Sequence, residues 1–171
     1  YSLTVPENVV TIEEFAFAVN NIQTLVLSDS TTFYGENAFL GNNITGSIMF
    51  GKDVYEIGDN AFSSNGISEF VIPEENEFYV THDGVLYTKN NKKLVSYPIG
   101  KQGTAYTVLD GTLEIEEGAF FNTRLRSVVL PDSLLIIHDL AFQYTRLEQI
   151  NIPDNVTSIG MGAFDMCGAT E

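Results

Sequence analysis

The dipeptide Ala-Phe recurs six times along the chain at an almost fixed spacing, and this repeat constrains the fold more than any other feature. From one Phe to the next, the steps are 22, 23, 58, 22 and 22 residues. A fixed period near 22 is typical of a solenoid, in which each coil buries its apolar face only against its neighbours. We therefore expect function to lie on a surface rather than in a pocket. The six copies are Ala16-Phe17, Ala38-Phe39, Ala61-Phe62, Ala119-Phe120, Ala141-Phe142 and Ala163-Phe164.

The rest of each unit repeats as well. An aliphatic residue stands five positions after most of the Phe residues, and a short run with apolar residues at every second position follows, which predicts a strand with one buried face. A Pro or small residue and usually an acid come next, and this pair predicts a turn that ends the strand. Each coil is predicted to contain a strand, a Pro-Asp turn, a short β segment and one tight helical or 3₁₀ turn carrying Ala-Phe. The predicted strands are centred on residues 25–27, 48–50, 70–72, 128–130 and 150–152.

The small Ala and the large Phe have separate roles in this prediction. Neighbouring coils stack at about 4.8 Å, the spacing of paired strands. At that distance the Phe rings form an interior column, whereas a residue larger than Ala would push the coils apart. Burying each Phe stabilises the fold by about 1.5–3 kcal/mol.

One coil breaks the period. The step from the strand end at Ile72 to the next at Val108 is 36 residues, and no Ala-Phe lies inside it. Turn signals at Asp83-Gly84 and Asn90-Asn91 separate β-rich runs. Two linked hairpins are predicted, residues 78–80 with 85–88 and then 93–97, within an irregular insertion over 74–104. The insertion is interpreted either as a binding loop or as a local hairpin that completes one coil.

Several of these segments resemble the BspA-type leucine-rich repeats. The resemblance rests on Ile-Gly-Asp-Asn-Ala-Phe at 57–62, Val-Ile-Pro at 71–73 and the run 152–167, and the insertion segments 83–87 and 94–98 are similar to an interruption that recurs in such proteins. The family often places Cys three positions after Phe, whereas this chain has Asn20, Asn42, Asn65, Thr123, Thr145 and Cys167. The resemblance implies a β-rich leucine-rich-repeat solenoid over residues 1–171, from a cell-surface or secreted protein. Adhesion to host matrix or plasma proteins, or between cells, is the role it implies.

Charge narrows the possible partners. The formal net charge is −15, and nucleic acid or an anionic membrane is a poor partner for such a chain because phosphate contacts need Lys and Arg. No apolar run approaches the roughly 18 residues that cross a bilayer. Both ends are expected to cut through a repeat, as in a fragment of a longer protein. We predict an extracellular or cell-surface location and no membrane insertion.

The outward positions of the long strands are the candidate binding face. Two columns of residues point away from the core, and Glu69 is their one charged member although the chain has 31 charged residues. An exposed neutral face of this size commonly marks an interaction site, although Val and Thr also suit strands that bind nothing. The candidate residues are Val26, Met49, Val71, Thr107, Val129 and Asn151 in one column, and Thr24, Ser47, Glu69, Ser127 and Gln149 in the other.

Acids after each strand form a second column. Stacked carboxylates repel unless they are hydrogen-bonded or bridged by a cation. Because the sequence lacks a calcium-binding loop motif, the preferred interpretation is that these side chains cap turns, and no metal or cofactor is predicted. The column consists of Glu7, Asp29, Asp53, Glu74, Asp110, Asp132 and Asp154.

The sequence shows no arrangement typical of an enzyme. His82 and His138 are far apart and are each interpreted as surface residues, and Cys167 is the single cysteine. Two functions are therefore retained. The first is a non-enzymatic module that binds a protein through the neutral face. The second is a structural spacer that presents another domain and binds nothing itself.

Overall fold

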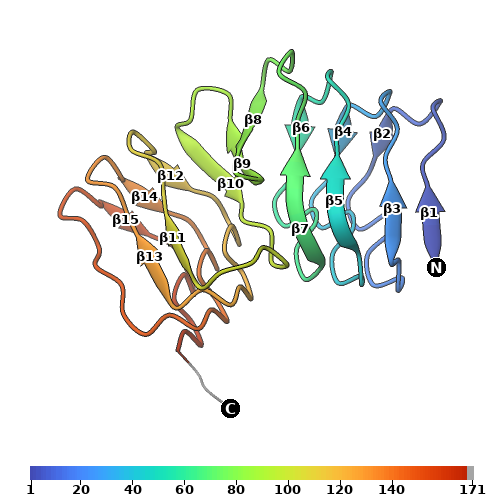
Figure 1. Cartoon of the computed structure of the whole chain (residues 1–171). Helices are drawn as coiled ribbons and strands as arrows, with labels where there is room; N and C mark the ends of the chain where they lie inside the picture. Colours follow the sequence, from blue (N-terminus) through green and yellow to red (C-terminus); the bar gives the residue numbers. More distant parts are fainter. Residues whose placement is uncertain (169–171) are drawn as a thin grey trace.

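The structure, a computed structural model, describes residues 1–168 as a stack of coils with the two chain ends at opposite ends of the stack (Figure 1). The strands lie in two rows that run along the stack, and no helix is present among the described residues. The predicted β-rich solenoid, with its period near 22 residues and its irregular coil, is confirmed. Residues 169–171, the end of the predicted domain, lie outside the described range.

The first row contains the longer strands and the second row the short strands that follow the Pro-Asp turns. The first row consists of β1 (Ser2–Thr4), β3 (Thr24–Val26), β5 (Thr45–Met49), β7 (Gly66–Val71), β11 (Ala105–Thr107) and β13 (Ser127–Val129). The second row consists of β2 (Thr11–Ile12), β4 (Phe33–Tyr34), β6 (Glu56–Ile57), β12 (Glu114–Ile115), β14 (Ile136–Ile137) and β15 (Ser158–Ile159). The insertion supplies β8 (Tyr79–His82), β9 (Val85–Thr88) and β10 (Lys93–Ser96).

Pairing between coils is parallel and follows the repeat. Ser2 pairs with Thr24, and Tyr106 with Val128, each one period apart. The first row forms three separate pairs, β1-β3, β5-β7 and β11-β13. In the second row, β2, β4 and β6 form a three-stranded sheet, while β12, β14 and β15 join β8, β9 and β10 of the insertion in a six-stranded sheet. The strand predicted at 150–152 is wrong, because the last coil pairs with β13 only through an isolated bridge at Gln149 and residues 150–152 form no strand.

The Ala-Phe segment folds as two hydrogen-bonded turns rather than the predicted single helical or 3₁₀ turn. In the second coil, the N–H of Ala38 donates to the carbonyl of Gly35 at 3.2 Å, and that of Leu40 to Asn37 at 3.1 Å. Asn37, between these turns, has φ of 56°. Such a left-handed residue interrupts a right-handed helix. The N–H of Phe39 then donates to Ala61 of the next coil at 2.7 Å, so the segment bonds between coils as a strand does.

The predicted Phe column is confirmed as two stacks, one in each half of the molecule. Phe39 lies nearly parallel to Phe17 and Phe62, with ring centroids 5.3 and 5.2 Å away. Phe142 lies between Phe120 and Phe164 at 4.8 and 5.1 Å. Each of these spacings is close to the strand separation that sets the coil height.

The insertion divides the hydrophobic core in two. β8, β9 and β10 form antiparallel hairpins, as predicted, and lie between the coils of the two halves (Figure 1). Side chains of β9 alternate between the two cores, since Leu86 packs in the first while Val85 and Tyr87 pack in the second. β9 is therefore the partition between two stacks of coils, and its period-two alternation allows one strand to serve both.

Candidate functional site

The repeat register brings the predicted face residues side by side in the first row. Met49 pairs with Val71, Thr107 with Val129, and Ser127 with Gln149. All eleven candidates are solvent-exposed except Val71, which is half-buried. Val26, Met49 and Val129 expose 52%, 68% and 56% of their surface, which is far more than the buried Leu25, Ile48 and Val128 beside them in the same strands. Whether this face binds a partner remains a prediction.

Glu69, the one charge on the face, does not stand alone. The hydroxyl of Ser47 on the neighbouring strand donates a hydrogen bond to the Glu69 carboxylate. Both residues belong to the outer column that borders Met49 and Val71. The face is therefore neutral except for the Glu69 carboxylate, which accepts a hydrogen bond from the neighbouring coil.

The insertion separates the face into two areas. The N–H of Phe70 on β7 donates to the carbonyl of Gly84 at 2.9 Å, and the N–H of Gly100 donates to Ile67 at 2.7 Å. These bonds occupy the edge of β7 that is not paired with β5. A side chain at position 100 would place its Cβ 2.2 Å from the backbone oxygen of Gly66, so the close approach requires glycine. Val71 and Thr107 therefore belong to two separate neutral areas.

A shallow groove marks the area in the second half. It has a volume of about 440 Å³ and lies between β13 and residues 149–151 of the last coil. The groove brings four of the predicted residues together around buried aliphatic side chains. Its lining comprises Ser127, Val128, Val129, Leu130, Gln149, Ile150 and Asn151.

The acid column borders the face, but the capping role predicted for it is wrong. The turns are closed by backbone bonds, such as those from Thr31 to Ser28 at 3.1 Å and from Leu134 to Pro131 at 3.0 Å. Among residues 1–168, none of the column's carboxylates accepts a backbone hydrogen bond, and Asp53 contacts Lys52 at 2.8 Å. The acids therefore form an exposed negative rim beside the neutral face.

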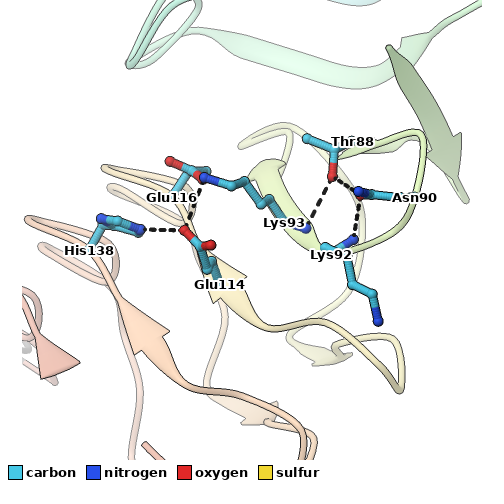
Figure 2. A network of polar contacts seen from close by, with 7 residues as sticks. All are labelled: Thr88, Asn90, Lys92, Lys93, Glu114, Glu116 and His138. Carbon is cyan, nitrogen blue, oxygen red and sulfur yellow. Dashed lines mark hydrogen bonds and ion pairs between the residues drawn. The ribbon is translucent and has the colours of Figure 1, made fainter. Parts of the chain in front are cut away.

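The second row carries a polar cluster that the sequence interpretation did not identify (Figure 2). Lys93 on β10 extends to Glu114 on β12 and to Glu116, with its Nζ 3.0 Å and 2.8 Å from their carboxylate oxygens. His138, which follows β14, points its Nε2 at Glu114 Oε2 from 2.9 Å. The ligand atoms of Glu114, Glu116 and His138 lie within 4.8 Å of one another. The signal was present in the sequence, because Glu116 and His138 are one 22-residue period apart.

Charge pairing shifts the pKa values in this cluster in opposite directions. Hydrogen bonding to Glu116 raises the pKa of Lys93 against the effect of burial. Partial burial acts to raise the pKa of Glu114, but the hydrogen bonds from His138 and Lys93 outweigh it and lower the pKa. Asp59 and Glu117 lie nearby, and burial together with neighbouring carboxylates raises the pKa of each. Negative charge is therefore only partly compensated here.

His82 and Cys167 have structural surroundings. His82 contacts Asn91 at 2.8 Å across the hairpin of the insertion and packs edge-on against Tyr87. The thiol of Cys167 donates to the carbonyl of Phe142 at 2.9 Å and contacts the hydroxyl of Thr145 at 3.1 Å. Cys167 therefore joins two coils through polar contacts.

The fold is that of known leucine-rich repeat proteins. A leucine-rich repeat protein from Eubacterium ventriosum superposes with a TM-score of 0.73 at 24% identity, over 92% of this chain and 49% of that one. A leucine rich cell surface protein from Faecalibacterium prausnitzii gives 0.71 at 27% identity, over 95% and 51%. The pneumococcal vaccine antigen PcpA gives 0.57 at 19% identity, over 93% and 58%. The chain thus spans about half the length of these structures.

Other comparisons limit what can be carried over. None of the curated proteins matches the chain. Within residues 1–168 there is no helix long and apolar enough to span a membrane. Proteins built from these repeats are generally non-catalytic scaffolds, consistent with a protein-interaction or adhesion-type module. The model of the BspA type leucine rich repeat region matches in six copies over residues 1–83 and 104–171, and the chain belongs to this family.

Proposed function

We propose that this chain is a non-enzymatic protein-binding module of a cell-surface or secreted protein, which adheres to extracellular matrix or plasma proteins or to other cells through its neutral first-row face. The face combines exposed aliphatic side chains with hydroxyl and amide groups, and an acidic rim borders it. Protein interfaces have an apolar centre depleted in charge and a polar rim. A pneumococcal vaccine antigen and a leucine rich cell surface protein share the fold, which supports an extracellular location.

The single observation that carries this proposal is the exposure of Met49 and Val129. Their side chains point outward from paired strands and are more than half exposed, although apolar residues elsewhere in these strands are buried. Water contact with these groups costs free energy, at about 25 cal/mol per Å² of apolar surface, which binding of a partner would recover. An inert surface gives no such gain.

The test is surface-based binding of the chain to immobilised fibronectin, fibrinogen and other matrix proteins. The variant Met49→Lys/Val129→Lys places a charge in each of the two neutral areas. We expect its affinity to fall at least about tenfold, or 1.4 kcal/mol, because a buried unpaired ammonium opposes binding. Val71→Lys is a less suitable probe, since Val71 is half-buried and its replacement also affects folding.

Leu135→Lys/Ile159→Lys is the matched control. Both are exposed aliphatic residues of the second row, one just before β14 and one on β15, so the same two charges are added away from the face. Loss of binding in the face variant alone establishes the proposed surface. Equal loss in both variants points to non-specific charge effects and contradicts it. If neither the unmodified chain nor its variants show saturable binding, the spacer function is favoured.

A further inference from the structure

We propose that Glu114, Glu116 and His138 form a binding site for a divalent transition-metal ion such as Zn²⁺, and that Lys93 competes with the metal for the two carboxylates. This site lies in the second row and does not depend on the proposed adhesive face. Its three ligand atoms come from neighbouring coils and already converge within 4.8 Å (Figure 2).

The sheet, rather than a loop, fixes the geometry. Glu114 lies on β12 opposite Ile136 of β14. His138 follows Ile136 by two residues, just after the end of β14. Glu116 stands at the position equivalent to His138, one coil earlier, and the N–H of His138 donates to the carbonyl of Ile115 at 2.9 Å. Ligands held on paired strands keep their spacing, which is the preorganisation that a metal site requires.

The donor set favours one class of metal. Zn²⁺ binds imidazole nitrogen and carboxylate oxygen at about 2.0–2.2 Å in tetrahedral sites, with water often completing the shell. Ca²⁺ and Mg²⁺ prefer six or more oxygen ligands and do not favour imidazole. His138 Nε2 lies 2.9 Å from Glu114 Oε2, so small side-chain rotations bring both atoms onto one ion.

The electrostatics of the site favour a cation with more charge than Lys93 carries. Lys93 contributes one positive charge against the two carboxylates that it contacts at 3.0 and 2.8 Å. Asp59 adds negative charge nearby, and burial and the charge of Glu116 raise its pKa. The Lys93 side chain is 41% exposed, so its ammonium can move into water when an ion of charge +2 takes its place.

The experiment is isothermal titration calorimetry of the chain with ZnCl₂ at pH 7, accompanied by thermal unfolding with and without the metal. We expect one site in the unmodified protein. Lys93→Met removes the competing ammonium and should tighten binding at least about tenfold, whereas Glu116→Gln and His138→Asn should each weaken it at least about tenfold. Zinc should raise the midpoint of thermal unfolding of the Lys93→Met variant more than that of the unmodified protein.

Two controls separate this site from other zinc ligands. His82→Asn removes the other histidine of the sequence and Cys167→Ser its one thiol, and both should leave the affinity unchanged. Circular dichroism checks that each variant is folded. The proposal is overturned if neither the unmodified chain nor the Lys93→Met variant binds zinc. Affinity that survives both Glu116→Gln and His138→Asn, or binding of Ca²⁺ as tight as that of Zn²⁺, also contradicts it.

Discussion

The two halves of the molecule join their coils with different side chains at the same repeat position. In the first half, up to β7, this position is occupied by Asn20, Asn42 and Asn65, of which Asn42 and Asn65 are buried and Asn20, in the first coil, is exposed. The amide of Asn42 donates to the carbonyls of Phe17 and Phe39 at 2.8 and 3.0 Å. Its oxygen accepts from the N–H groups of Asn20 and Ile22, both at 3.0 Å. One side chain therefore satisfies four backbone groups of two coils.

The second half, from β11 onward, has Thr and Cys at this position and makes fewer bonds there. Thr145 donates to the carbonyl of Phe142 in its own coil at 2.8 Å. Cys167 reaches the same carbonyl from the following coil at 2.9 Å. The buried hydroxyl of Thr123 has no partner among residues 1–168. A hydroxyl has a single donor, so it cannot bridge as an amide does.

This difference shows which parts of the coil are interchangeable. The Phe stacks have almost the same geometry in both halves, with spacings of 5.2–5.3 Å in the first and 4.8–5.1 Å in the second. The polar position beside the stack changes, whereas the backbone bond from Phe to the Ala of the next coil is kept, at 2.7 Å from Phe39 to Ala61 and 2.8 Å from Phe120 to Ala141. We infer that the apolar column sets the coil height and that the polar position adjusts how strongly neighbouring coils are joined.

The largest expected effect tests the feature that the halves share. Phe39→Ala and Phe142→Ala each remove a fully buried ring that stacks on two neighbours. Both should lower the free energy of unfolding by about 3–5 kcal/mol, because a cavity remains and aromatic contacts are lost. Urea unfolding measures the loss. Hydrogen exchange should locate the lost stability in the first half for Phe39→Ala and in the second half for Phe142→Ala. Losses that differ by more than about 2 kcal/mol between the two variants would contradict the equivalence of the stacks.

A second substitution addresses the difference between the halves. Asn42→Ala should cost about 2–3 kcal/mol, since buried N–H and C=O groups of two coils lose their partner. Asn43→Ala is the control, because Asn43 is exposed and donates to another exposed side chain, Asn21. Its effect should stay within about 0.5 kcal/mol. Equal losses in the two variants, measured by urea unfolding, would show that the buried amide does not hold the coils together.

The second half allows a finer comparison at the same position. Thr145→Val should cost about 1 kcal/mol, the net contribution of one hydrogen bond. Thr123→Val should be neutral or slightly stabilising, because the hydroxyl it removes is buried without a partner. The two substitutions are isosteric, so thermal unfolding reports the hydroxyl alone. A clear destabilisation by Thr123→Val would mean that this hydroxyl is bonded in solution.

Periodicity was sufficient to predict much of this architecture from the sequence. The spacing of Ala-Phe predicted the coils, and the inward positions Leu25, Ile48 and Val128 are buried as expected. The helical turn was wrong because a left-handed residue such as Asn37 or Asn60 precedes Ala, and a hydrophobic period does not reveal φ. The strand at 150–152 was wrong because strand pairing depends on the neighbouring backbone as well as on alternation.

The site was less predictable because surface chemistry depends on contacts between coils. Comparing equivalent positions of successive repeats identified the neutral face. It did not reveal that Gly84 and Gly100 bond to the edge of β7 and so divide that face. The cluster around Lys93 was missed for a related reason. Lys93 belongs to the irregular insertion, whose register with β12 follows from a hairpin rather than from the 22-residue repeat.

The smallest expected effect concerns the boundary between the two halves. Asn60 of the first half donates to Glu117 of the second at 3.2 Å. Burial, and then repulsion from Glu116 and Glu36, raises the pKa of Asp59. Burial and then repulsion from Asp59 also raise the pKa of Glu117. A carboxyl with a raised pKa in the folded state favours folding below its unfolded pKa, and this contribution is lost as the pH rises through the folded value.

Asp59→Asn should therefore stabilise the protein at pH 7, by about 0.5 kcal/mol or less because Asp59 is only partly buried and water screens its charge. The gain should disappear as the pH falls below the ordinary carboxyl range. Glu114→Gln should show the opposite sign, since the pKa of Glu114 is lowered and its stabilising contribution is present at neutral pH and lost in acid. Urea unfolding at a series of pH values from 7 down to about 3, below the ordinary carboxyl pKa values, measures both trends. If Asp59→Asn destabilises the chain at pH 7, the Asp59 carboxylate makes a favourable interaction at the boundary between the two halves instead of a repulsive one. The two halves are then coupled more tightly than their separate cores indicate.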